Sequence, residues 1–182
     1  MLESVIHEIE KINKELCIVA IDGRCGAGKT TLALNLKKRL NCSVIHMDDF
    51  FLRPPQRTEQ RLNEPGGNID YERFLQEIVK PLKESKTVCY RPFNCHTLSF
   101  DQEKTVKPSK VIIVEGSYSC HPKFSDIYDV KLFMDIDAKE QLNRIEKRNG
   151  KERLNDFVKK WIPIEESYFS AFKIKEKCDI CF

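Results

Sequence analysis

The sequence predicts a single α/β domain built on a five-stranded parallel sheet. Apolar segments of strand length recur along the 182 residues, at 16–21, 42–47, 111–115, 130–135 and 178–182. Helical patterns separate most of these segments, and apolar strands joined by helices are typical of a parallel sheet covered on both faces. No linker, repeat or low-complexity tract divides the chain. We therefore expect one domain over residues 1–182.

The first apolar segment leads directly into a glycine-rich loop, and a helical pattern over 30–38 follows the loop. The loop fits G-x-x-x-x-G-K-[ST], the phosphate-binding P-loop. Strand, loop and helix in this order point backbone N–H groups and the positive end of a helix dipole at an anion. The fold class is then the three-layer P-loop NTPase fold. The residues expected to bind a nucleoside triphosphate are Gly23, Arg24, Cys25, Gly26, Ala27, Gly28, Lys29, Thr30 and Thr31.

Three side chains of the loop carry specific expectations. Lys29 should reach the β- and γ-phosphates, and Thr30 should offer its hydroxyl to Mg²⁺. Cys25 precedes the helix N-terminus by a few residues, a position that lowers the pKa of a thiol. This gives the hypothesis that oxidation of Cys25 blocks nucleotide binding.

Composition and charge narrow the classes of partner. The net charge is +3 and the chain has no basic block, so we expect no nucleic-acid partner. No apolar run approaches the ~20 residues of a membrane span, and the acidic N-terminus is unlike a secretory signal. We expect a cytoplasmic protein without a membrane partner. The eight cysteines are then free thiols, and Cys178-x-x-Cys181 lacks the second pair of a zinc site.

The remaining elements follow from periodicity and turn residues. An N-terminal helix is predicted by one apolar face: Leu2, Val5, Ile6, Ile9 and Ile12. Residues 52–69 are rich in Pro, Arg and Gly and are interpreted as a loop, followed by a helix over 71–82 with Asp70 as N-cap. Residues 87–90 and 97–100 are candidates for a paired β excursion. We interpret 52–110 as an acceptor-binding insertion.

The charged segment 138–177 is predicted to be helical. It is interrupted near Gly150 and again at Pro163, where the proline should force a kink or a break. We expect residues 138–160 to form a mobile lid. Arg144, Arg148 and Arg153 in this segment are candidates for stabilising a migrating phosphoryl group. The alternative is that they belong to an ordinary solvated helix face.

Acidic residues follow two of the predicted strands. Asp48 and Asp49 follow the second strand, and ligands of open α/β sheets bind at the carboxyl ends of strands. One of the two carboxylates is therefore expected to act as the base for an acceptor hydroxyl; the residues alone do not decide which. Glu115 ends an apolar strand as in a Walker B motif and should lie by Mg²⁺. The alternatives are a capped turn and a solvated strand end.

Four segments together resemble the uridine kinase and phosphoribulokinase group of P-loop kinases: 22–31, 46–51, 68–74 and 114–118. The resemblance runs from about residue 16 to the C-terminus. The P-loop specifies only the superfamily. The acidic pair followed by Phe50 and Phe51, at this distance from the loop, narrows the resemblance from the superfamily to this group of kinases.

The resemblance implies roles for individual residues. It implies that Asp48 is the catalytic base and a neighbour of the metal, that Glu115 sits by the metal, and that Arg144 and Arg148 belong to the lid. It also implies that Asp70 holds the ribose hydroxyls, and that Tyr90 and His96 contact the base of a nucleoside.

The expected function is an ATP- and Mg²⁺-dependent kinase for a small molecule, with the 5′-hydroxyl of uridine or a related nucleoside as acceptor. Uridine kinases place an aspartate soon after the tyrosine, whereas Arg91 follows Tyr90 here. Arg91 favours an acceptor that carries a carboxylate or phosphate. The alternatives are therefore a kinase for pantothenate or a sugar phosphate, and a non-catalytic nucleotide-binding module. The oligomeric state stays open, with a homo-oligomer as one alternative.

Overall fold

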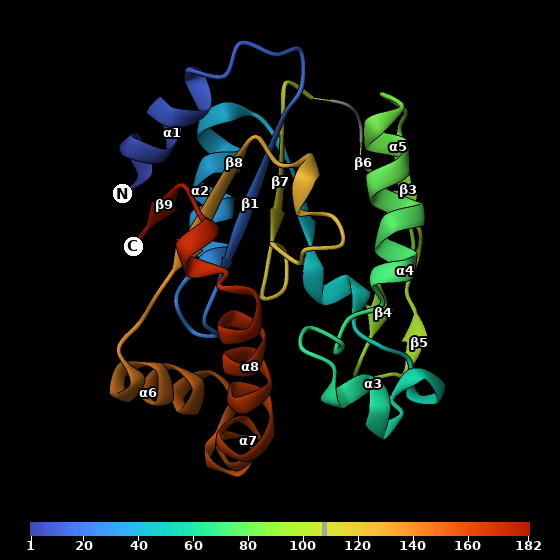
Figure 1. The fold of residues 1–182 in the computed structure, drawn as a ribbon, viewed down its shortest axis with the longest axis vertical. Coiled ribbons are helices and arrows are strands. Elements are labelled where there is room, and N and C mark those ends of the chain that lie inside the picture. Colours follow the sequence, from blue (N-terminus) through green and yellow to red (C-terminus); the bar gives the residue numbers. More distant parts are fainter. Residues whose placement is uncertain (107–108) are drawn as a thin grey trace.

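The computed structural model describes residues 1–106 and 109–182. Its sheet contains β2 (Ser43–His46), β7 (Val111–Glu115), β1 (Cys17–Gly23), β8 (Val130–Met134) and β9 (Ile180–Cys181), in that spatial order. Every neighbouring pair is parallel. The predicted five-stranded parallel sheet is confirmed, and Figure 1 shows it at the centre of the molecule.

Helices cover both faces of the sheet (Figure 1). One face packs against α1 (Leu2–Glu10) and α2 (Lys29–Leu40), and the other against α8 (Ile162–Phe172) and the helix that begins at Tyr71. The side chains of β1 divide between the two cores, with Val19 and Ile21 on the α1–α2 side and Ile18 and Ala20 on the other. This alternation produces the three layers.

The helix predicted over 71–82 is present, with an irregular middle turn. It consists of α4 (Tyr71–Phe74), a π turn at Leu75–Val79 and α5 (Lys80–Lys83). Asp70 caps it as predicted, because its side chain accepts a hydrogen bond from the backbone N–H of Arg73. The expected loop 52–69 also contains structure: a 3₁₀ turn at Pro54–Gln56 and the short helix α3 (Glu59–Asn63).

The pairing expected for the β excursion is wrong. β3 (Val88–Tyr90) pairs with β6 (Lys104–Val106), and β4 (Phe93–Asn94) pairs with β5 (Ser99–Phe100), both antiparallel. Buried Val88 lies opposite Val106, and Phe93 lies opposite Phe100 with ring centroids 5.8 Å apart. These cross-strand apolar pairs select the register. Residues 107 and 108 of the expected insertion 52–110 lie outside the described residues.

The charged C-terminal segment forms α6 (Ala138–Asn149), α7 (Lys151–Asp156), a π turn at Phe157–Trp161 and α8. The break at Gly150 is confirmed, since this residue has φ 84° and ψ 163°. At Pro163 a kink or a break was expected: the helix does not break there, and it continues from α7 into α8 through the irregular π turn at Phe157–Trp161. A π turn directly before the proline accommodates its ring and missing N–H, and the π turn at 75–79 stands in the same relation to Pro81.

The other short elements are 3₁₀ turns at Met47–Phe50, Ser125–Ile127 and Lys175–Lys177. The predicted N-terminal helix buries Val5, Ile6 and Ile9 as expected. Within the described ranges, no helix combines the length and apolar character needed to cross a bilayer. Figure 1 places β4, β5 and α3 to one side of the sheet's lower end, and α6 and α7 below it.

Candidate active site

The glycine-rich loop connects β1 to α2 in a conformation that requires its glycines. Gly23, Gly26 and Gly28 have φ values of 128°, 81° and 96°, which side chains disfavour. A Cβ on Gly23 would lie 2.1 Å from the carbonyl oxygen of Met134. α2 begins at Lys29, directly after Gly28. The loop thus presents backbone N–H groups at a helix N-terminus, the arrangement that binds phosphate.

The Lys29 ammonium is held beneath the loop. Its Nζ donates to the carbonyl oxygens of Gly23 at 2.5 Å and Arg24 at 2.9 Å, and lies 3.2 Å from Ser117 Oγ. The residue is only 8% exposed. The positive charge is therefore fixed where phosphate oxygens would meet it.

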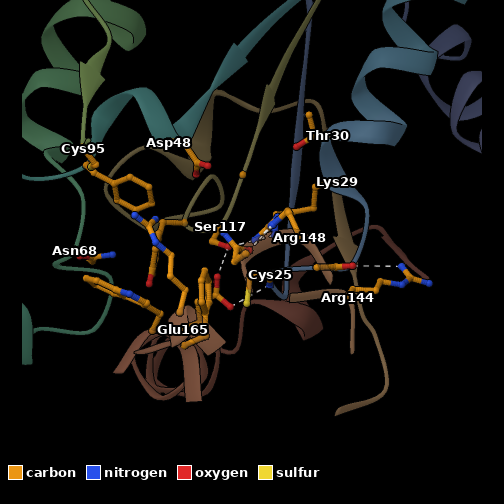
Figure 2. Close-up of a pocket in the computed structure, with 18 of the residues that line it drawn as sticks. Cys25, Lys29, Thr30, Asp48, Asn68, Cys95, Ser117, Arg144, Arg148 and Glu165 are labelled. Atoms are coloured by element: carbon orange, nitrogen blue, oxygen red, sulfur yellow. Dashed lines mark hydrogen bonds between the residues drawn. The ribbon is translucent and has the colours of Figure 1, made fainter. Parts of the chain in front are cut away.

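A cavity of about 980 Å³ opens beside the loop at the carboxyl ends of β1, β2 and β7. This is the expected place for a ligand in an open α/β sheet. Figure 2 shows Lys29 and Thr30 at one end and Asn68 and Cys95 at the other. The cavity brings together most of the predicted site residues: Cys25, Gly26, Gly28, Lys29, Thr30, Thr31, Asp48, His96, Glu115, Arg144, Arg148 and Arg153.

Glu115 and Thr30 offer oxygen ligands side by side. Both carboxylate oxygens of Glu115 lie 3.2 Å from Thr30 Oγ1, and Glu115 Oε1 lies 2.5 Å from His46 Nδ1. The hydrogen bond to Glu115 raises the pKa of His46 above its ordinary value. Carboxylate and hydroxyl oxygens are the ligands that Mg²⁺ prefers.

Asp48 lines the same cavity close to Glu115. Burial raises the pKa of Asp48 above its ordinary value, and the charge of Glu115 raises it further. Two carboxylates this close favour a divalent cation nearby. Among the described residues, no group of three His, Cys, Asp or Glu side chains forms a metal cage. With the carboxylates of Asp48 and Glu115 and the Thr30 hydroxyl in one cavity, the site fits Mg²⁺ that takes its remaining ligands from water and phosphates.

The arginines that were expected in a lid lie on the cavity wall. Arg144 Nε donates to Glu140 at 2.7 Å, and its Nη1 lies 3.3 Å from the Gly26 carbonyl oxygen of the loop. Arg148 Nε donates to Asn149. Arg144 and Arg148 thus lie within one cavity with the loop, on helix α6.

Comparison with known proteins agrees with this geometry. The model of the phosphoribulokinase and uridine kinase family matches residues 18–168. The chain belongs to this family. The predicted family resemblance and P-loop fold are therefore confirmed.

Individual relatives of this family are similar at moderate identity. The chain is 31% identical over 148 residues to a uridine kinase of Chlamydia pneumoniae, covering 76% of this chain and 66% of that protein. It is 29% identical over 178 residues to a uridine kinase of Staphylococcus aureus, covering 88% and 84%. It is 34% identical over 100 residues to human nicotinamide riboside kinase 1. This match covers 54% of this chain and 48% of that protein, about half the length of each.

Solved structures share the fold. A possible uridine kinase from Bacillus stearothermophilus superimposes with a TM-score of 0.79 at 21% identity, covering 100% of this chain and 96% of that one. A putative fructose transport system kinase from Silicibacter superimposes with a TM-score of 0.74 at the same identity and the same coverage. At this identity the likeness concerns the arrangement of the elements.

Several residues singled out within this family fold lie outside the cavity. The Asp70 carboxylate accepts from Arg73 N and Gln56 Nε2, and the Tyr90 hydroxyl donates to Asp49. Arg91 Nε donates to the Asp101 carbonyl at 3.1 Å, and Nη2 to the Phe100 carbonyl at 3.4 Å. Gly23, Arg24 and Ala27 belong to the loop but do not line the cavity.

The cavity also contains residues that were not singled out from the sequence. Arg57 and Asn68 come from the expected loop 52–69, and Cys95 lies beside His96 in the excursion. Glu165 comes from α8, outside the expected lid, and Tyr118 and Ser117 follow β7. The family-like segments offered a signal for three of them: Asn68 shares the segment 68–74 with Asp70, and Ser117 and Tyr118 share the segment 114–118 with Glu115.

The lowered pKa expected for Cys25 is wrong. Burial, followed by the charge of Glu165, raises the pKa of the Cys25 thiol to about 12. The charge of Lys29 and the hydrogen bond from Gln141 lower this pKa by less than burial and Glu165 raise it. The thiol is therefore protonated at neutral pH, and it lacks the thiolate that oxidation requires.

Proposed function

We propose that this protein is an ATP-dependent kinase that transfers the γ-phosphoryl group to a hydroxyl of a small molecule, favouring the 5′-hydroxyl of uridine or a related nucleoside. One observation carries the proposal. Asp48, a carboxylate without a hydrogen-bond partner among the described residues, shares a cavity with Lys29 and Thr30 of the phosphate loop. The relatives named uridine kinase support the choice of acceptor.

Asp48 is the proposed base. The acceptor oxygen forms a bond to the γ-phosphorus, the bond between that phosphorus and the β–γ bridging oxygen breaks, and the hydroxyl proton passes to Asp48. The raised pKa of Asp48 makes it a better proton acceptor than an ordinary aspartate. ADP and the phosphorylated acceptor leave.

The other cavity residues position charge around the phosphates. Lys29 and the loop N–H groups bind the nucleotide phosphates, and Arg144, Arg148 and Arg153 stabilise the charge of the transferring group from the lid. Thr30 and Glu115 would hold Mg²⁺, which neutralises phosphate charge when it is bound. Catalysis of this kind depends on positioning and electrostatics.

The second candidate function is phosphorylation of an anionic metabolite such as a sugar phosphate. Arg57 favours it. Arg57 lies in the cavity with Cys95 and His96. Its Nε donates to the Leu52 carbonyl, and among the described residues it has no carboxylate partner. An arginine without a carboxylate partner can hold a carboxylate or phosphate of the acceptor. The sequence suggested Arg91 for this role, but Arg91 does not line the cavity.

A panel of acceptors tests both candidates. Purified protein with Mg²⁺-ATP is mixed with uridine, cytidine, nicotinamide riboside, pantothenate or sugar phosphates, and ADP release is followed. Release that depends on uridine or cytidine supports the proposal. Release only with anionic acceptors replaces it by the second candidate. ATP binding without acceptor-dependent release for any compound contradicts both.

A further inference from the structure

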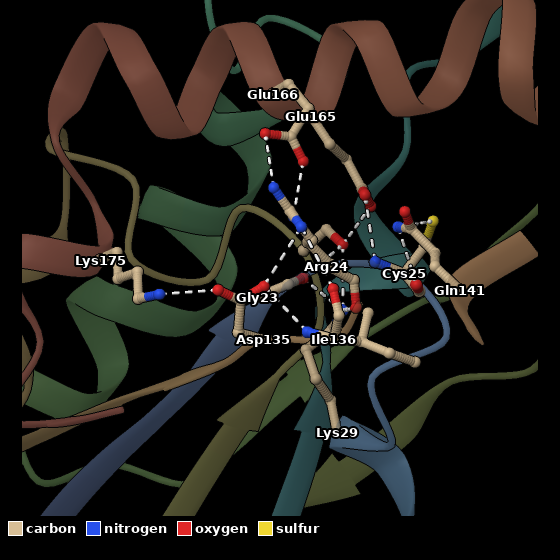
Figure 3. Close-up of polar contacts among 11 residues, drawn as sticks. Gly23, Arg24, Cys25, Lys29, Asp135, Ile136, Gln141, Glu165, Glu166 and Lys175 are labelled. Carbon is tan, nitrogen blue, oxygen red and sulfur yellow. Dashed lines mark hydrogen bonds and ion pairs between the residues drawn. The ribbon is translucent and has the colours of Figure 1, made fainter. Parts of the chain in front are cut away.

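Two consecutive carboxylates of α8 hold this helix against the phosphate loop (Figure 3). Glu165 Oε2 accepts from the backbone N–H of Cys25 at 3.1 Å, and its Oε1 accepts from Ser117 Oγ at 2.5 Å. Glu166 pairs with Arg24 at 2.7 Å. Glu165 is only 6% exposed, whereas the Glu166 side chain is 41% exposed. The loop therefore binds an anion of its own chain.

The position of the Glu165 carboxylate relative to the proposed chemistry is defined by its neighbours. Ser117, which donates to Glu165, lies 3.2 Å from Lys29 Nζ, and the P-loop lysine reaches the β- and γ-phosphates. The charge of Glu165 also contributes to the raised pKa of Asp48. Glu165 thus lies on the side of the loop that faces both Lys29 and the proposed base. This is the γ-phosphate end.

We propose that Glu165 occupies the γ-phosphate end of the loop and discriminates between nucleotides by the number of their phosphates. A triphosphate must displace this carboxylate from Cys25 N and Ser117 Oγ, whereas a diphosphate leaves it in place. The inference rests on the proposed function, since it takes the loop to bind a nucleotide. It adds a specificity-determining residue and couples triphosphate binding to a shift of α8.

The physical reason is the repulsion of like charges in a buried site. A carboxylate and a γ-phosphate that compete for the Cys25 N–H and the Ser117 hydroxyl cannot be accommodated together without a large electrostatic cost. Glu165 therefore weakens triphosphate binding selectively. A purely structural Glu165, which only fixes the shape of the loop, would affect both nucleotides equally.

Nucleotide affinities separate these two roles. We would measure the Kd of ATP and of ADP, with Mg²⁺ and without acceptor, for the wild-type protein, for Glu165→Gln and for Glu166→Gln. Glu165→Gln removes the charge and keeps one acceptor oxygen. The expected result is ATP binding that is tighter by about tenfold, with ADP affinity changed by less than about threefold. Glu166→Gln, which loosens the same helix at Arg24, should change both affinities by the same factor.

A second measurement needs no variant. Hydrogen–deuterium exchange of the wild-type protein should show faster exchange in α8 with ATP than with ADP. An equal change in both affinities for Glu165→Gln, or a selective loss of ATP affinity, overturns the inference, as does α8 exchange that is identical with the two nucleotides. If neither nucleotide binds the wild-type protein, the proposed function and the inference fail together. If both bind and the affinity ratio is unchanged, only the inference fails.

Discussion

Asp48 and Asp49 are adjacent in the chain but have different surroundings. Asp49 Oδ2 accepts a hydrogen bond from the Tyr90 hydroxyl at 2.9 Å and pairs with Lys104 Nζ at 3.0 Å. Asp48 lines the cavity opposite the phosphate loop, and no hydrogen bond of the described residues involves its carboxylate. The first carboxylate is free to accept a proton, while the second ties the 3₁₀ turn to the excursion.

This difference predicts separate effects for two matched variants. Asp48→Asn should lower kcat by about 10³-fold, since a base in hydrogen-bond reach contributes roughly 10²–10⁴-fold. Its Kd for ATP should stay within about threefold of the wild type. Asp49→Asn should keep kcat within about tenfold and lower the melting temperature by a few degrees, because it weakens the contacts to Tyr90 and Lys104. Turnover near the wild-type rate in Asp48→Asn would show that the assignment is wrong.

A second matched pair concerns the acceptor. Arg57→Ala should raise the KM of an anionic acceptor by about tenfold or more, since a charge-assisted hydrogen bond is lost. It should change the KM of a neutral nucleoside by less than about threefold. Arg91→Ala removes hydrogen bonds to two backbone carbonyls outside the cavity and should leave both KM values unchanged. Steady-state kinetics with the two classes of acceptor measure this, and a KM effect confined to Arg91→Ala would contradict the placement.

The buried Asp22 predicts a pH dependence of stability. It accepts hydrogen bonds from the N–H groups of Gly23, Tyr118 and Cys120 and from the Tyr168 hydroxyl. Burial nevertheless raises its pKa from 3.8 to about 6. Between about pH 4 and pH 6 the folded state therefore binds a proton that the unfolded chain releases. The contribution of Asp22 to the free energy of unfolding is then greatest below pH 4 and falls as pH rises through 6.

The non-titrating variant Asp22→Asn isolates this term. The free energy of unfolding of the wild type minus that of the variant should fall by about 2 kcal/mol between pH 4 and pH 7, since the full shift from 3.8 to about 6 corresponds to about 3 kcal/mol and part of it is already lost at pH 4. Above pH 7 the difference should be constant. Denaturant titrations of both proteins at several pH values provide the measurement. A difference that rises with pH would contradict the assigned direction.

The raised pKa of Cys25 predicts low reactivity. Cys89 and Cys181 are exposed on the surface, whereas the Cys25 thiol has a pKa of about 12. At pH 8 we expect Cys25 to react with iodoacetamide at least about 100-fold more slowly than Cys89, because the thiolate is the nucleophile. Peptide mass spectrometry of a labelling time course compares the two sites. Labelling of Cys25 ahead of Cys89 would restore the redox hypothesis.

The local features of this fold were predictable from the sequence, and the long-range ones were not. The P-loop, the apolar strands and the Asp70 cap are encoded in consecutive residues, so pattern and turn chemistry identify them. The partner of β3 depends on the match of buried Val88 with Val106 across an intervening hairpin. From the sequence, residues 87–90 were predicted to pair with the nearer segment 97–100, because no local pattern distinguishes the two possible partners.

The cavity illustrates the same limit. Four cavity residues were identified from local patterns. Lys29 and Thr30 are part of the P-loop motif, Asp48 follows a predicted strand, and Glu115 ends one. Glu165 meets Cys25 across 140 residues of chain, and no motif in the sequence around Glu165 indicates this contact. Tyr90 and Arg91 are residue types that often bind ligands. In this structure the Tyr90 hydroxyl donates a hydrogen bond to Asp49, and the Arg91 guanidinium donates one to the Phe100 carbonyl. Residue type alone does not reveal such partners.

The most direct test of the proposed kinase is the identity of the product. Wild-type protein and Asp48→Asn are incubated with uridine and Mg²⁺-ATP, and ³¹P NMR follows the phosphates. The proposal predicts a new 5′-phosphomonoester that grows in step with ADP in the wild type and is nearly absent in Asp48→Asn, although the variant still binds ATP. Inorganic phosphate as the product, or the same phosphomonoester at the same rate from both proteins, would contradict the proposal that Asp48 drives transfer to the acceptor hydroxyl.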